Sequence, residues 1–84
     1  MPNMMDYLTV LGRQRLELAR KYNLESFYSP FMGNIYIDSK FITEDLMNKV
    51  HKFLKENQDW VMGYEDNGES MNLYITHLDD LMEA

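Results

Sequence analysis

The fold of this 84-residue chain is decided by the stretch 60-WVMGYEDNGESMNLYI-75. Within it, Asn67-Gly68 occupies the two central positions of a type I′ turn, which is the strongest short-range signal for a β-hairpin. If Asp66 faces Glu69 across this turn, one face of the hairpin is entirely apolar or aromatic, because side chains alternate along a strand. The predicted register on that face pairs Tyr64 with Met71, Met62 with Leu73 and Trp60 with Ile75. We therefore predict a hairpin over 60–77 whose apolar face packs on a core.

Two amphipathic helices are predicted before the hairpin. The first runs from about Met4 to Tyr22 with Asn3 as N-cap, and its apolar face consists of Met4, Leu8, Leu11, Leu18, Ala19 and Tyr22. The second follows the N-cap Thr43 and ends at Asn57, and its apolar face consists of Leu46, Met47, Val50, Phe53 and Leu54. Each helix therefore has one face to bury.

Between the helices the helical period disappears, and Ile35-Tyr36-Ile37 predicts a short strand at 35–38. We expect an irregular strand before Gly33 to pair with it, and Pro30 restricts that segment to an edge strand or a loop. The tail from His77 adds a helical turn. The order is αββ–αββ, and burial of every apolar face requires a single α+β domain, residues 1–84, with two helices packed on one face of a small antiparallel sheet. The other sheet face is left open.

The net charge of −6 is unevenly distributed along the chain. Residues 1–23 contain four basic residues and two acids, whereas residues 24–84 contain four lysines and twelve acids. Cysteine is absent, which excludes disulfides and thiolate metal sites. The N-terminus lacks the pattern of a signal peptide, and no apolar stretch approaches the ~20 residues that cross a bilayer. We expect a cytoplasmic protein without membrane contact.

The residues that could carry chemistry form no catalytic pattern. No serine lies in a Gly-x-Ser-x-Gly turn, the glycines match no phosphate-binding loop, and the segment 66–69 lacks the earlier oxygen ligands of a calcium loop. His51 and His77 are interpreted as partly buried structural residues rather than general bases. The segment 77–80 offers two or three metal ligands but no matched partner. We predict no enzyme activity, no cofactor and no metal site.

Three features remain as candidates for binding. The acidic C-terminal third is either a solvated surface or a ligand for a basic protein, and its partner-binding candidates are Glu65, Asp66, Glu69, Asp79 and Asp80. The open sheet face is either ordinary exposed surface or a protein interface, with the aromatic candidates Tyr36 and Tyr74, Val61 beside them, and Tyr28 and Phe31 as an extension. Arg15 lies on the apolar stripe of the first helix, so it either pairs with an acid of the C-terminal region or anchors a ligand.

These features favour a small non-enzymatic protein-binding module, an inhibitor or adaptor that acts on a partner with a basic surface. In size, charge and lack of cysteine the chain resembles phage and mobile-element products such as anti-CRISPR and anti-restriction proteins, which implies carboxylates that mimic a nucleic acid. A homodimer is an alternative to a monomer, because a small domain gains burial by self-association. The alternative function is nucleic-acid binding, which the net charge disfavours. It would use Arg13, Arg20, Lys21, Lys49, Lys52 and Lys55.

Overall fold

The computed structural model describes residues 4–66 and 68–82, with side chains described for 10–66 and 68–81. In these ranges the helices are α1 (Met4–Lys21), α2 (Glu44–Glu56) and α3 (Leu78–Met82), with two 3-10 turns, η1 (Glu25–Phe27) and η2 (Ser39–Phe41). The strands are β1 (Tyr28–Ser29), β2 (Asn34–Ile37), β3 (Trp60–Asp66) and β4 (Met71–His77). They form a four-stranded antiparallel sheet in the order β1-β2-β4-β3. The predicted α+β class is confirmed.

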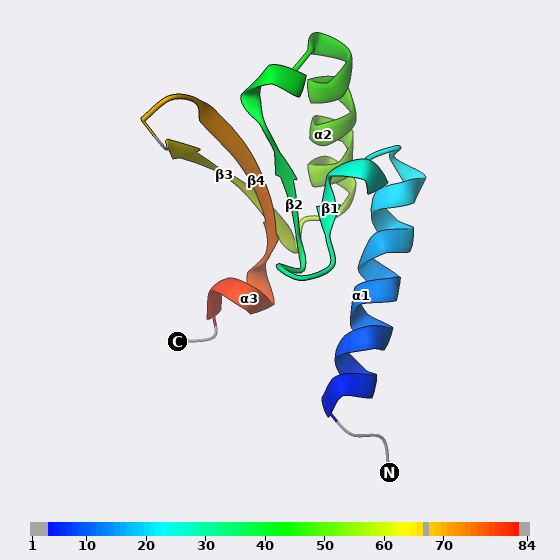
Figure 1. Cartoon of the computed structure of the whole chain (residues 1–84). Coiled ribbons are helices and arrows are strands. Elements are labelled where there is room, and N and C mark those ends of the chain that lie inside the picture. The colour runs from blue at the N-terminus through cyan, green and yellow to red at the C-terminus, as the bar shows by residue number, and fades with distance from the viewer. Residues whose placement is uncertain (1–3, 67, 83–84) are drawn as a thin grey trace.

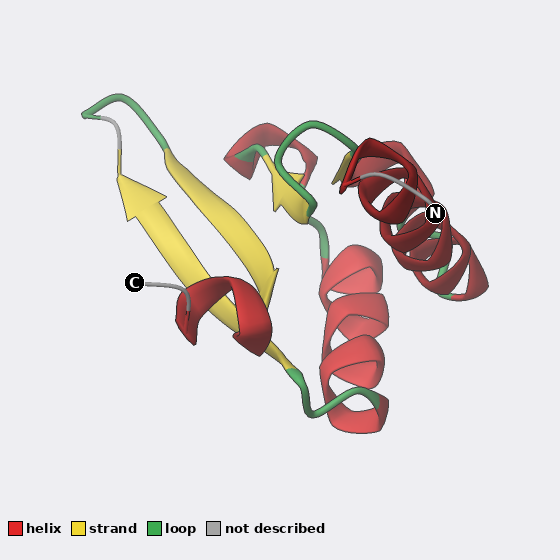
Figure 2. Ribbon diagram, turned by 90° about the horizontal axis from the view of Figure 1, so that it is seen from below, coloured by secondary structure: helices red, strands yellow, loops and turns green. Residues whose placement is uncertain are grey.

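The helices α1 and α2 lie on the same side of the β3–β4 hairpin, and α3 lies beyond the end of the sheet where β4 finishes (Figures 1 and 2). The core between helices and sheet is built from both layers, and its fully buried apolar side chains include Ala19, Leu24, Ile35, Ile37, Val50, Phe53, Leu73 and Ile75. Among the described residues, no helix has the length and apolar character needed to cross a membrane.

The boundaries of α2 follow the capping residues that the sequence indicates. The side chain of Thr43 accepts a hydrogen bond from the N–H of Leu46 at 3.1 Å, which begins the helix. Asn57 ends it, and its side-chain amide donates to the carbonyl of Phe53 at 2.9 Å and to the hydroxyl of Tyr22 at 3.1 Å. The Tyr22 contact ties the C-terminal end of α2 to the segment that follows α1.

The end of α1 also has a local cause. The helix stops at Lys21, one residue before the predicted end, and Asn23 follows with φ 59, a left-handed conformation typical of helix C-termini. The N–H of Leu24 then donates to the carbonyl of Ala19 at 2.9 Å, which closes the last turn. The predicted N-cap Asn3 and the side chains of Met4 and Leu8 lie outside the described part of the chain.

The predicted register of the hairpin is wrong by two residues. The observed pairs are Trp60 with His77, Met62 with Ile75, Tyr64 with Leu73 and Asp66 with Met71. The connection between the strands therefore spans residues 67–70 instead of the two residues of a type I′ turn, and Asn67 itself lies outside the described residues. An even shift keeps every side chain on its predicted face, because the side-chain period is two. Trp60, Leu73 and Ile75 are buried as predicted.

Contacts outside the turn account for the observed register. Asn72 is buried, and its side-chain oxygen accepts a hydrogen bond from the N–H of Ser39 in η2 at 3.2 Å. At the other end of the hairpin the ring of Trp60 packs edge-on against His77 at 5.2 Å between centroids. Leaving a buried amide without a partner costs more than a turn preference provides. These long-range contacts therefore outweigh the local signal of Asn67-Gly68.

The core covers only part of the apolar face of the hairpin. Tyr64 is 60% exposed and Met71 is 52% exposed, so the prediction that both pack in the core is wrong, although both lie on the predicted face. Tyr28 also departs from its expected place on the open face. It pairs with Ile35, shares the core side of the sheet and is buried, while Phe31 is fully outside the core at 95% exposure.

Candidate protein-binding site

The sheet face turned away from α1 and α2, called the open face, carries Tyr36 of β2 and Tyr74 of β4. The two residues are cross-strand partners, and their rings meet edge to face at 4.9 Å between centroids. On its other side Tyr74 is paired with Gly63, and no atom lies within 4 Å of the position that a Cβ of Gly63 would take. The ring of Tyr74 therefore packs on Tyr36 on one side, and Gly63 presents no side chain on the other.

Two carboxylates border this tyrosine pair. The negative charge of Glu65 in β3 acts on both tyrosines, and the charge of Asp38, just after β2, acts on Tyr36. Partial burial raises the pKa of both tyrosines above the ordinary value, and the negative charge of Glu65 raises each pKa further. The tyrosines are therefore neutral at physiological pH. We call Tyr36, Asp38, Glu65 and Tyr74 the tyrosine–acid cluster.

Asp66 and Glu69 lie at the tip of the hairpin, and both are exposed. The side chain of Asp66 accepts a hydrogen bond from the N–H of Gly68 at 2.8 Å, which is the local bond of an Asx turn. Gly68 has φ +89, a conformation that side chains other than glycine rarely adopt. Asp66 thus shapes the turn and also contributes charge to the surface around it.

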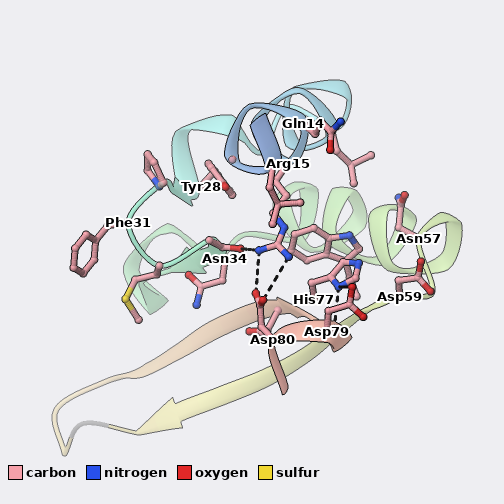
Figure 3. A pocket seen from close by; sticks show the side chains of 18 of the residues that line it. Gln14, Arg15, Tyr28, Phe31, Asn34, Asn57, Asp59, His77, Asp79 and Asp80 are labelled. Carbon is pink, nitrogen blue, oxygen red and sulfur yellow. Dashed lines mark hydrogen bonds and ion pairs between the residues drawn. The ribbon is translucent and has the colours of Figure 1, made fainter. Parts of the chain in front are cut away.

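Arg15 reaches from α1 to the opposite end of the hairpin (Figure 3). Its guanidinium donates to the carbonyl of Gly33 and to the carboxylate of Asp80, each at 3.0 Å, and lies 5.5 Å from the ring centroid of Trp60. The Arg15 side chain is only 10% exposed. Of its two predicted roles, the structure shows an ion pair with an acid of the C-terminal region. Asp80 is thereby engaged within the molecule and holds α3 against α1.

The predicted partner-binding residues therefore do not form one surface. Tyr36, Tyr74 and Glu65 come together on the open face, and Asp66 and Glu69 follow at the tip. Asp79 and Asp80 lie at the base, about 20 Å from the tip, because six rises of roughly 3.3 Å separate Met71 from His77 along β4. Asp79 is the more accessible of these two acids, with an 81% exposed side chain.

Sequence reasoning missed Asp38 and the contact between Trp60 and His77. No local pattern links Asp38 to Glu65, because only the strand order β2-β4-β3 brings them to one face. Strand alternation was the signal that could have found Asp38, since it follows Tyr36 by two residues. The contact of Trp60 with His77 could not be predicted, because the two residues become cross-strand partners only in the observed register.

Neither a metal site nor a basic nucleic-acid surface lies on the open face of the described residues. Within residues 4–66 and 68–82, no three His, Asp or Glu side chains are grouped in a way that could hold a metal ion. The six basic residues of the nucleic-acid alternative are exposed on α1 and α2, in the layer opposite the open face, and Arg20 is paired with Glu17 at 3.0 Å. No protein-family profile, curated protein or solved structure matches the chain.

Proposed function

We propose that this protein is a non-enzymatic binding module that engages a partner protein with a basic surface through the tyrosine–acid cluster. The observation that carries the proposal is the edge-to-face contact of Tyr36 with Tyr74, close to the charge of Glu65, on a sheet face that no helix of the described residues covers. A lysine or arginine of a partner would meet a carboxylate and an aromatic ring at the same place, and the two attractions add. Tyrosine is also enriched at protein interfaces.

The acids of the hairpin tip extend the cluster and have a different effect. Exposed charges act over several ångströms and steer an oppositely charged partner toward the surface, whereas ring contacts hold it after docking. A cytoplasmic inhibitor or adaptor that imitates phosphate charge in a nucleic-acid-binding groove is the role that this combination supports. The same negative charge opposes direct binding of a nucleic acid.

Capture experiments from the native cell extract, at low and high salt, test this proposal. The triple variant Glu65→Gln, Asp66→Asn and Glu69→Gln should reduce capture of a basic protein as strongly as high salt does, because both remove Coulomb attraction. Tyr74→Ala should weaken capture by about tenfold or more at every salt concentration, since lost apolar contact is not screened. Thermal melting of each variant checks that the fold persists.

The matched control is Glu44→Gln, which removes one exposed charge at the start of α2, in the layer opposite the open face. It should leave capture unchanged. If the triple variant and Tyr74→Ala both capture as well as the wild type, the cluster is not the binding site. Submicromolar binding of DNA or RNA to the wild type at physiological salt would instead favour the nucleic-acid alternative.

A further inference from the structure

A pocket of about 900 Å³ opens at the base of the hairpin, away from the tyrosine–acid cluster (Figure 3). Four segments form its walls: α1 near Arg15, the loop between β1 and β2, the loop between α2 and β3, and the junction of β4 with α3. Trp60 and His77 form an aromatic wall, with their rings edge to face at 5.2 Å. The pocket is therefore a composite of segments that are distant in sequence.

The charge of the pocket is negative. Its lining carries four carboxylates, from Glu56, Asp59, Asp79 and Asp80, against the single guanidinium of Arg15. Asp80 is paired with Arg15, which leaves three carboxylates without a Lys or Arg partner in the described part of the chain. Asp79 lies 3.6 Å from Nδ1 of His77, and that nitrogen already accepts the N–H of Asp79. A cation entering the pocket would meet uncompensated negative charge.

Two buried oxygen atoms of residues that line the pocket have no hydrogen-bond partner. Among the described residues, the hydroxyl of Tyr28 and the side-chain oxygen of Asn34 are buried with no hydrogen-bond partner. Tyr28 is 8% exposed and Asn34 is 6% exposed, and both residues line the pocket. The hydroxyl of Tyr28 is close enough to Arg15 and Asp80 for both charges to act on it. Buried polar groups without partners are costly, so a ligand that donates hydrogen bonds gains from this wall.

Arg15 already uses three of its N–H groups within the molecule. Nη1 of Arg15 donates to the carbonyl of Gly33 and to Asp80, and Nη2 donates to Asp80 at 3.5 Å. The same guanidinium lies over the ring of Trp60, so the pocket already accommodates one guanidinium between an aromatic ring and oxygen acceptors. The unpaired acids Asp59 and Asp79 lie on the solvent side of that arrangement, where both are exposed.

We propose that this pocket binds a second guanidinium, the side chain of an arginine presented by the partner protein. A guanidinium offers five N–H donors with a positive charge, which matches a wall that is rich in acceptors, negative and partly aromatic. The inference rests on the proposed function in one respect, because it takes the partner to be basic. It adds a second contact that anchors one arginine at the base while the open face holds the rest of the surface.

The test uses the intact protein with Nα-acetyl-arginine amide as the ligand and Nα-acetyl-citrulline amide as its neutral isostere. Trp60 is the only tryptophan, so its fluorescence reports on the pocket directly, and backbone amide shifts of residues 58–60 and 77–80 locate the ligand. We expect saturable binding of the arginine amide, with the citrulline amide weaker by about tenfold, because charge-assisted hydrogen bonds are the stronger kind.

Variants separate a specific site from general attraction by an acidic protein. The pair Asp59→Asn and Asp79→Asn should weaken the arginine amide by about tenfold. The matched pair Glu44→Gln and Asp45→Asn removes the same charge at the start of α2 and should leave affinity within about twofold, because distant exposed charges are screened. Tyr28→Phe, which removes the unpartnered hydroxyl with little change in shape, should weaken binding while the protein stays folded.

Three results would overturn the inference: no saturable change with the arginine amide, equal binding of the citrulline amide, or equal losses in the pair at the base and the pair at the start of α2. Each is read on the isolated protein and does not depend on a partner. The proposed function is judged separately by Tyr74→Ala and the tip acids in capture experiments. A pocket that fails to bind arginine while capture still depends on Tyr74 would remove this inference alone.

Discussion

The two ends of the β3–β4 hairpin differ, although the alternation of apolar residues is continuous from one end to the other. At the base, Trp60 is 5% exposed and is enclosed by Phe53 of α2, His77 of β4 and Arg15 of α1. At the tip, Tyr64 and Met71 are more than half exposed on the same face of the same strands. The cause is the position of the helices, because the tip projects away from both of them (Figures 1 and 2).

This difference shows that an alternating apolar face identifies the side of a core and not its extent. It also separates the acids by what they do. At the base an acid, Asp80, is used inside the molecule to pair Arg15, whereas at the tip Asp66 and Glu69 remain exposed. The exposed end is therefore the one where charge and apolar surface are available together for a partner.

The largest expected effect on stability comes from shortening a buried side chain of the hairpin, compared with an exposed side chain near its tip. Leu73→Ala should lower the free energy of unfolding by about 3 kcal/mol, because Leu73 is fully buried and a cavity remains. Met71→Ala, two residues away on the same face, should cost under about 0.5 kcal/mol. Urea unfolding measures both, and Ile75→Val, at about 1 kcal/mol, provides a milder core variant. Equal losses at Leu73 and Met71 would show that the core extends to the tip.

The next largest effect on stability comes from removing one of two arginine ion pairs, which have the same 3.0 Å separation between nitrogen and oxygen. Arg15 is 10% exposed in its side chain, whereas Arg20 and its partner Glu17 are 58% and 59% exposed. Arg15→Ala should cost about 2 kcal/mol, since it removes packing on Trp60 and leaves the Gly33 carbonyl without its donor. Arg20→Ala should cost under about 0.5 kcal/mol. Double-mutant cycles with Asp80→Ala and Glu17→Ala measure the two couplings, and a larger coupling for Arg20 would contradict this view of the base.

The smallest effect is a pH dependence that comes from the open face. The raised pKa values of Tyr36 and Tyr74 mean that the unfolded chain loses these protons first as the pH rises. Their contribution to stability is therefore complete below pH 10.0, the ordinary tyrosine value, and is lost as the pH rises through the higher folded values. The double variant Tyr36→Phe and Tyr74→Phe should flatten the decline of unfolding free energy above this pH.

Urea unfolding at a series of pH values from neutral to strongly alkaline measures this decline, and Tyr64→Phe serves as the control because Tyr64 lies outside the tyrosine–acid cluster. An unchanged decline in the double variant would show that Glu65 and Asp38 have no electrostatic influence on the two hydroxyls. That outcome would also weaken the case for the cluster as a combined acidic and aromatic surface.

Features that depend on a few neighbouring residues could be predicted from the sequence. The caps Thr43 and Asn57 set the ends of α2 through hydrogen bonds to residues three or four positions away. The faces of the hairpin followed from alternation alone, and they survived a register error because the error was even. For Arg15 the sequence indicated two alternative roles, an ion pair with an acid of the C-terminal region or a ligand anchor, because a charge on an apolar stripe needs a partner.

Only the tertiary structure decided which distant groups meet. It selected Asp80 as the partner of Arg15, placed Asp38 beside the open face with Glu65, and set the hairpin register through Asn72 with Ser39 and Trp60 with His77. The physical reason is one of magnitude: burying a ring stabilises the fold by about 1–3 kcal/mol, and leaving a buried amide without a partner costs about as much, which is more than a turn preference provides. Where a local turn preference and long-range burial disagree, as at Asn67-Gly68, burial therefore determines which residues of the two strands pair.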